Sequence, residues 1–137
     1  MAIDIRTLAT TNLIIQLVII AFIFGAVCLA RKGKVIRHCT ILRGAVVVQL
    51  VAILAIMLPS LLGYVENIPP IPFLYPELLI HHALGLILIV LFVYINLEVG
   101  GVIRPLIYRK KIMRLALGIW LIALALGINI YLTIYFA

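Results

Sequence analysis

Four long apolar runs, separated by short polar segments, account for most of the chain. Polar side chains are sparse inside these runs, which cover residues 12–30, 42–65, 77–99 and 113–135. Because a helix rises about 1.5 Å per residue, about 20 apolar residues cross a hydrocarbon core of roughly 30 Å. The pattern predicts four membrane spans in an all-α antiparallel four-helix bundle, with residues 1–137 forming a single transmembrane domain.

Composition supports a membrane protein rather than a soluble one. The chain is 67% hydrophobic and 11% charged, with a mean hydropathy of +1.37, whereas soluble domains have about a quarter of their residues charged. The lipid bilayer is therefore the expected environment.

Cys28 and Cys39 lie outside any CxxC or CxxCH motif, which argues against a zinc knuckle and covalently attached c-type haem.

The positive charges are concentrated in two short segments. The net charge is +7, and ten of the eleven Lys and Arg residues lie within residues 31–43 and 104–114, between apolar runs. Such clusters set membrane topology, so no nucleic-acid partner is expected. The positive-inside rule predicts both clusters on the inner side of the cell membrane and both termini outside, in a multi-pass protein.

Two adjacent histidines, His81 and His82, lie near the start of the third run. Ionisable groups inside a membrane span are costly and are interpreted as functional by default. Gln16, Ser60 and Asn129 are expected at a similar depth in the other three spans. The sequence therefore predicts a buried polar site in the outer half of the bundle, centred on the two histidines.

A second polar stripe is predicted along the second span. His38, Gln49 and Ser60 are spaced by eleven residues, which is close to three helical turns, so a regular helix places them on one face. Such a stripe is suited to conduct protons or to hold a cofactor. The alternative is that these side chains only form hydrogen bonds between helices.

The histidines favour b-type haem, which four-helix bundles hold through axial imidazoles. His81 and His82 are neighbours about 100° apart on one helix, so they do not grip one iron from opposite sides. His38 is expected on the far side of the membrane. Each haem is then five-coordinate, takes Met57 or another residue as its sixth ligand, or is shared across a homodimer. A copper or zinc site is disfavoured, because three histidines at two depths do not give three ligands to one metal.

Several short patterns suggest a family. Before the first span, Thr7 and Leu8 are followed by Asn12, and the second span opens with Arg37 and His38. The third span has His81 followed by Leu84 and Gly85, and the fourth has Arg114 followed by Trp120, Gly127 and Tyr131. With these patterns the chain resembles the four-span membrane family catalogued as domain of unknown function 420, which includes a factor needed to make an active cytochrome oxidase. The resemblance implies haem or copper handling in a respiratory membrane. The chain differs in having Lys110 and Lys111 where that family usually has a histidine.

These observations lead to one expected function and two alternatives. The expectation is a small b-type haem protein that transfers electrons between a quinol-like or outer-side donor and a respiratory partner complex. His81 or His82 is the expected iron ligand and His38 a second one, with Gln16, Ser60 and Asn129 around the cofactor. The alternatives are a non-catalytic assembly factor for a haem-copper oxidase, and an accessory subunit whose histidines only pack helices.

Overall fold

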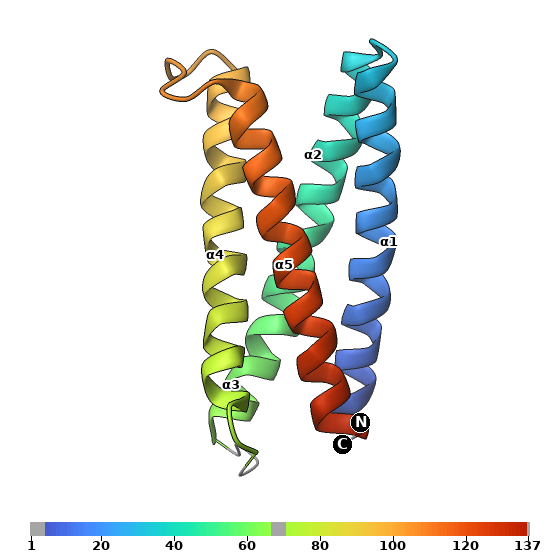
Figure 1. The fold of residues 1–137 in the computed structure, drawn as a ribbon, viewed down its shortest axis with the longest axis vertical. Coiled ribbons are helices and arrows are strands. Elements are labelled where there is room, and N and C mark those ends of the chain that lie inside the picture. The colour runs from blue at the N-terminus through green and yellow to red at the C-terminus, as the bar shows by residue number, and fades with distance from the viewer. Residues whose placement is uncertain (1–4, 67–70, 137) are drawn as a thin grey trace. The chain divides into compact units, whose positions relative to one another are not determined.

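The chain folds into long helices, as the apolar pattern predicts. A computed structural model describes residues 5–66 and 71–136, which contain helices and turns and no strand (Figure 1). The helical elements are α1 (Ile5–Arg31), α2 (Val35–Ala52), η1 (Ile53–Met57), α3 (Leu58–Glu66), α4 (Leu74–Val99) and α5 (Arg109–Phe136). Four helical stretches are long and apolar enough to cross a membrane. The predicted all-α class with four membrane-capable helices is confirmed, and it is compatible with a four-helix membrane bundle.

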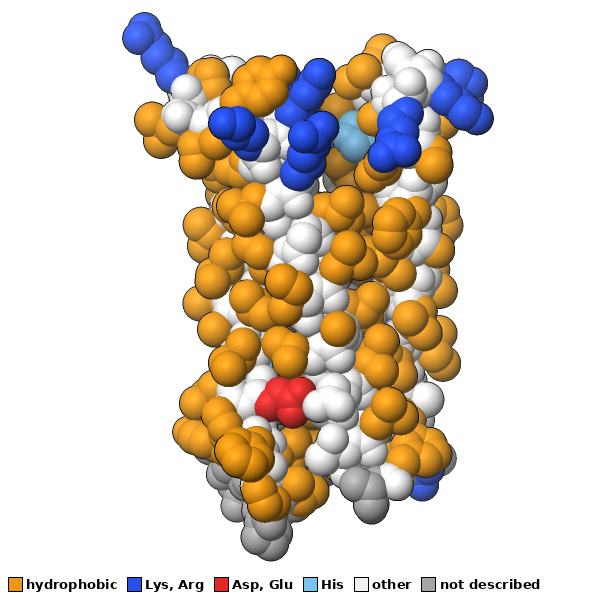
Figure 2. All heavy atoms as spheres, viewed as in Figure 1, with side chains coloured by type: hydrophobic (Ala, Val, Ile, Leu, Met, Phe, Trp, Pro, Cys, Tyr) orange, Lys and Arg blue, Asp and Glu red, His pale blue; other side chains and the backbone are white. Residues whose placement is uncertain are grey.

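The chain divides into two compact units, Met1–Pro69 and Pro70–Ala137. In the first, hereafter hairpin 1, α1 packs along α2, η1 and α3. In the second, hairpin 2, α4 packs along α5. Each hairpin is an antiparallel helix pair, and a cluster of Lys and Arg residues lies in or beside the connection between the paired helices. Large apolar side chains remain exposed along every helix, as suits contact with lipid (Figure 2).

The turn of hairpin 1 is short because α1 ends in a tight cap. The Lys34 N–H donates to the Leu29 carbonyl at 2.9 Å, and the Gly33 N–H donates to the Ala30 carbonyl at 3.0 Å. Gly33 has a φ of +74°, a left-handed conformation that glycine adopts without steric cost. The next helix begins at Val35, so Arg37 and Arg43 are part of α2, while Lys34 is the residue that precedes it.

The second helical stretch contains a π-helical segment, η1, directly before Pro59. Proline has no N–H, and its ring collides with the carbonyl four residues earlier, so the regular hydrogen-bond pattern fails at this point. The chain responds with a bond from the Leu58 N–H to the Ile53 carbonyl, one residue longer than in an α-helix. The helix then continues through α3 to Glu66. Pro59 therefore distorts the helix without ending it.

Hairpin 2 is held by aromatic packing and by an ordered loop. The rings of Phe92 in α4 and Trp120 in α5 lie with their centroids 5.2 Å apart. In the loop, the Leu106 N–H donates to the Tyr94 hydroxyl at 2.9 Å. Helix α4 begins at Leu74 rather than at the predicted residue 77, so it includes residues expected in the preceding loop.

Candidate functional site

His81 connects the two helices of hairpin 2. Its Nδ1 lies 2.9 Å from the carbonyl oxygen of Ala123 in α5. A carbonyl oxygen only accepts hydrogen bonds, so Nδ1 carries the proton and donates it. In the neutral imidazole, Nε2 is then the acceptor nitrogen. The bond fixes both the tautomer and the orientation of the ring.

Gly127 makes this position of the His81 ring possible. A Cβ atom built at residue 127 would lie 2.9 Å from Cε1 of His81, closer than side chains normally approach. The absence of a side chain in α5 therefore leaves the space that the imidazole fills. Ala123, which supplies the carbonyl, is itself a small buried residue. This part of α5 is shaped to receive His81.

His82 has a different set of contacts. Its Nδ1 lies 2.7 Å from the carbonyl of Leu78, one turn earlier in α4. The bond again places the proton on Nδ1, and it leaves Nε2 as the acceptor nitrogen. The rings of His81 and His82 are nearly perpendicular, at 83°, with centroids 5.3 Å apart. His82 therefore has an oriented ring, but no hydrogen bond from it to α5 is found among the described residues.

Glu77 and Asn129 extend the polar site towards the start of α4. The Asn129 amide donates to Oε1 of Glu77 at 2.7 Å, which joins α5 to α4. Glu77 lies four residues before His81, so the two side chains share a face of α4. The sequence predicted Asn129 in the site but treated Glu77 only as the end of a span. The sequence did contain a signal for this role of Glu77, because an acidic residue lies one helical turn before a histidine in a membrane span.

His38 makes the corresponding contact in hairpin 1. Its side chain is buried, with the residue 8% exposed, and Nδ1 lies 2.8 Å from the Ala26 carbonyl in α1. The ring therefore points into the helix pair, although Arg37 beside it is exposed. As with His81, the proton is on Nδ1 and Nε2 is the acceptor nitrogen of the neutral ring. Each hairpin thus has one histidine that bonds to the backbone of the neighbouring helix.

Hairpin 1 also holds amide and hydroxyl groups whose hydrogen bonds are incomplete. Within the described part of the chain, buried atoms without a partner include Asn12 Oδ1, Gln16 Nε2, Gln49 Oε1 and Ser60 Oγ. Unsatisfied polar atoms are costly in an apolar environment, so these atoms are candidates to bind a polar group. The π-helical segment between Gln49 and Ser60 adds about one residue of rotation. Ser60 is therefore turned away from the face that a regular helix would share with Gln49.

An ion pair at the other end of hairpin 2 was not predicted. Glu98, which is only 5% exposed, accepts hydrogen bonds from Arg109 Nε at 2.9 Å and from Nη2 at 2.7 Å, both on Oε1. Its Oε2 is buried and has no partner among the described residues. The sequence signal for this ion pair was Glu98, a single acidic residue next to a basic segment. Because the pair closes the α4–α5 loop, its role is to hold the hairpin together.

The predicted site residues are thus divided between the hairpins. Hairpin 1 contains Gln16, His38 and Ser60, and hairpin 2 contains His81, His82 and Asn129. Within residues 5–66 and 71–136, no three His, Cys, Asp or Glu side chains are grouped so that they could hold a metal ion. Both cysteines are free thiols.

Comparison of the chain with protein-family models, curated proteins and solved structures finds no match. The function is accordingly argued from the side chains of the two hairpins. Among these, the three histidines share one property: each donates from Nδ1 to a backbone carbonyl.

Proposed function

We propose that this chain is a small multi-pass membrane protein that binds b-type haem through His82. The observation that carries the proposal is the bond from His82 Nδ1 to the Leu78 carbonyl, which leaves Nε2 available. Histidines that ligate metals commonly donate their other ring N–H to a carbonyl, which fixes the ring and raises its basicity. This contact of His82 supports a role as an oriented iron ligand.

The other two histidines have contacts that already account for their presence. His81 and His38 each bond to the backbone of the neighbouring helix, and His81 also fills the space over Gly127. His82 bonds only within its own helix. Its placement in a membrane-capable helix is therefore not explained by helix packing, and this difference favours His82 over His81 as the ligand.

Haem suits this donor set better than a bare metal ion. Structural zinc takes four protein ligands and catalytic zinc commonly three, and no group of three candidate ligands occurs in the described residues. A porphyrin brings four nitrogen ligands of its own, so one imidazole is sufficient. His81 and His82 project from adjacent positions with centroids 5.3 Å apart, so they do not flank one haem. The proposal is therefore one histidine ligand per chain, and a bis-histidine centre would need a homodimer.

Bound haem would supply one-electron redox chemistry in a respiratory membrane, with a quinol or a respiratory complex as the exchange partner. The chain's own residues orient the ligand. Leu78 holds Nδ1 of His82, and the His81 ring, fixed against α5, packs edge-on to His82.

The test is an absorption spectrum of the detergent-purified protein in oxidised and dithionite-reduced states. Wild-type protein from haem-replete cells is expected to show a Soret band and a reduced α-band. His82→Ala is expected to lose both, while His81→Ala and His38→Ala keep the bands and lose stability. A wild-type protein that carries no haem and binds none when it is added would contradict the proposal. If that colourless protein retained an oxidase subunit, the assembly-factor alternative would take its place.

A further inference from the structure

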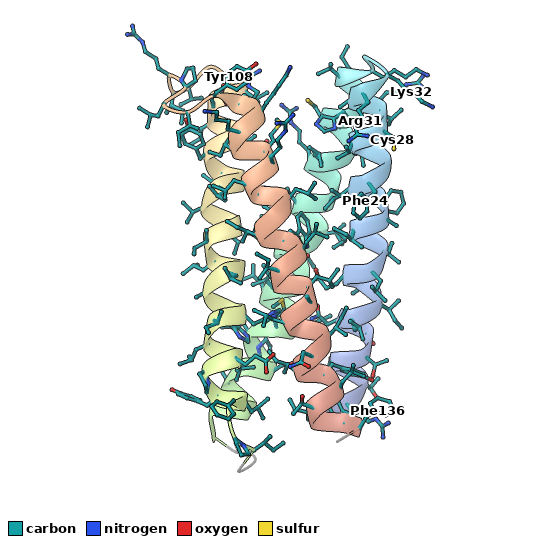
Figure 3. The ribbon with its side chains drawn as sticks, viewed as in Figure 1. Phe24, Cys28, Arg31, Lys32, Tyr108 and Phe136 are labelled. Atoms are coloured by element: carbon teal, nitrogen blue, oxygen red, sulfur yellow. The ribbon has the colours of Figure 1, made fainter. Side chains whose placement is uncertain are left out.

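We propose that the turn end of hairpin 1 binds the headgroups of anionic phospholipids. The proposed basic turn surface consists of Arg31, Lys32, Lys34, Arg37 and Arg43, all of them exposed. Figure 3 shows Arg31 and Lys32 at the end of α1 where the chain turns into α2. This inference goes beyond the haem proposal and does not depend on it.

No ion pair of these five cations is found within the described part of the chain. Among the described residues, the ion pair found is that of Arg109 with Glu98 in hairpin 2. Between residues 5 and 66 the sequence has a single acidic residue, Glu66, at the end of α3 away from this turn. Five like charges within thirteen residues repel one another, so an anion that binds between them is stabilised.

Two exposed apolar residues separate the cations. Val35 is 57% exposed and Ile36 is 85% exposed, and they lie between Lys34 and Arg37 in the first turn of α2. Exposing such apolar side chains to water is unfavourable in free energy. At a membrane surface they contact acyl chains, while the long Lys and Arg side chains reach the headgroups. The alternation of apolar and basic residues therefore suits the boundary between headgroups and hydrocarbon.

The position of the surface identifies lipid as the occupant. The membrane-capable stretch of the second helix begins at Val35, so Arg31, Lys32 and Lys34 lie before it, and Arg37 lies in its first turn, all at headgroup depth. Arg43 lies two turns further along, and its long side chain can extend back towards the headgroups. A nucleic acid would satisfy the charges but would leave Val35 and Ile36 without an apolar partner. An anionic phospholipid satisfies both, because its phosphate accepts hydrogen bonds from Lys and Arg and its chains cover the apolar pair.

The experiment measures lipid binding to the full purified chain by native mass spectrometry. Phosphatidylglycerol and phosphatidylcholine with identical acyl chains are titrated in a neutral detergent. Each cation near an anionic surface is expected to strengthen binding about fivefold. Wild-type protein should therefore bind phosphatidylglycerol at least about tenfold more tightly than phosphatidylcholine. The triple variant Lys32→Gln, Lys34→Gln and Arg37→Gln should lose most of that preference.

The matched control keeps the charge: Lys32→Arg, Lys34→Arg and Arg37→Lys should bind phosphatidylglycerol as the wild type does. Wild-type binding should weaken when salt is raised from about 0.05 M to about 0.5 M. Equal affinity of the wild type for the two lipids would overturn the proposal. So would full displacement of phosphatidylglycerol by inorganic phosphate, since the apolar pair would then be irrelevant. If the glutamine variant fails to fold, Val35→Ser with Ile36→Ser gives a second test, with weaker phosphatidylglycerol binding expected.

Discussion

The imidazole of His81 occupies the space that a side chain at Gly127 would fill, because a Cβ there would lie 2.9 Å from Cε1 of the ring. The same ring donates a hydrogen bond to the Ala123 carbonyl, one turn earlier in α5. His81 of α4 and the side-chain-free surface at Gly127 of α5 therefore form one packing contact. Disrupting this contact should lower the stability of the protein whether or not a cofactor is bound.

Gly127→Ala is expected to lower the free energy of unfolding by about 1–3 kcal/mol, because the new methyl group displaces the His81 ring. The matched control is Gly118→Ala, in the same helix, where a Cβ meets nothing within 4 Å. That control should be neutral or gain up to about 1 kcal/mol from helix propensity. Unfolding in mixed micelles, followed by circular dichroism, measures both. Equal effects of the two substitutions would contradict the packing described for His81.

His38→Ala is expected to destabilise hairpin 1 by about 0.5–2 kcal/mol, since the bond from Nδ1 to the Ala26 carbonyl is lost. Thr40→Ala, two residues later, is the control, because its hydroxyl bonds only within α2, to the Ile36 carbonyl. The measurement is again unfolding in micelles. A His38 variant as stable as the Thr40 variant would show that the bond between α1 and α2 contributes little.

The Glu98–Arg109 pair gives an asymmetric prediction. Arg109→Ala should cost about 1–3 kcal/mol, because it leaves a buried carboxylate without its counter-charge. Glu98→Gln should cost less, since the amide carries no charge to neutralise. The double variant Glu98→Gln/Arg109→Ala should be more stable than Arg109→Ala alone. Additive losses in this double-mutant cycle would mean that the two groups are not coupled.

The topology prediction is tested by reporter fusions. The Lys and Arg clusters lie in or beside the connections between paired helices, so both connections should lie on the inner side. Alkaline phosphatase, which is active only outside, should be active when fused after residue 137. Green fluorescent protein inserted near Leu106 should fluoresce, since it matures inside. The reverse pattern would place both termini inside.

The sequence predicted the helices well, because length and apolar composition alone decide whether a segment crosses a membrane. The boundaries were less accurate. Helix α1 begins at Ile5 and α5 at Arg109, both before the apolar runs, because basic and polar residues form the helix ends. The segment containing Pro69 and Pro70 lies outside the described residues.

The sequence singled out His81 and His82 as ionisable residues inside an apolar run, and His38 as the start of a polar stripe along the second span. Each of the three rings has an Nδ1 within hydrogen-bond distance of a backbone carbonyl. Their different partners were not predictable, since periodicity gives the face of a helix but not the carbonyl that the side chain reaches. The rotation at η1 was missed for a related reason. Pro59 signalled a distortion, but the eleven-residue spacing assumed a regular helix.

The division into two hairpins has a consequence for how the protein is made. In each hairpin the clustered cations lie in or beside the connection between the paired helices, while the chain between the hairpins, residues 67–73, has no Lys or Arg. During synthesis, a pair of spans can therefore enter the bilayer together while its charged turn stays on the ribosome side. With the predicted topology, membrane insertion would proceed in two events rather than four, and neither would require moving a cluster of positive charges across the hydrocarbon.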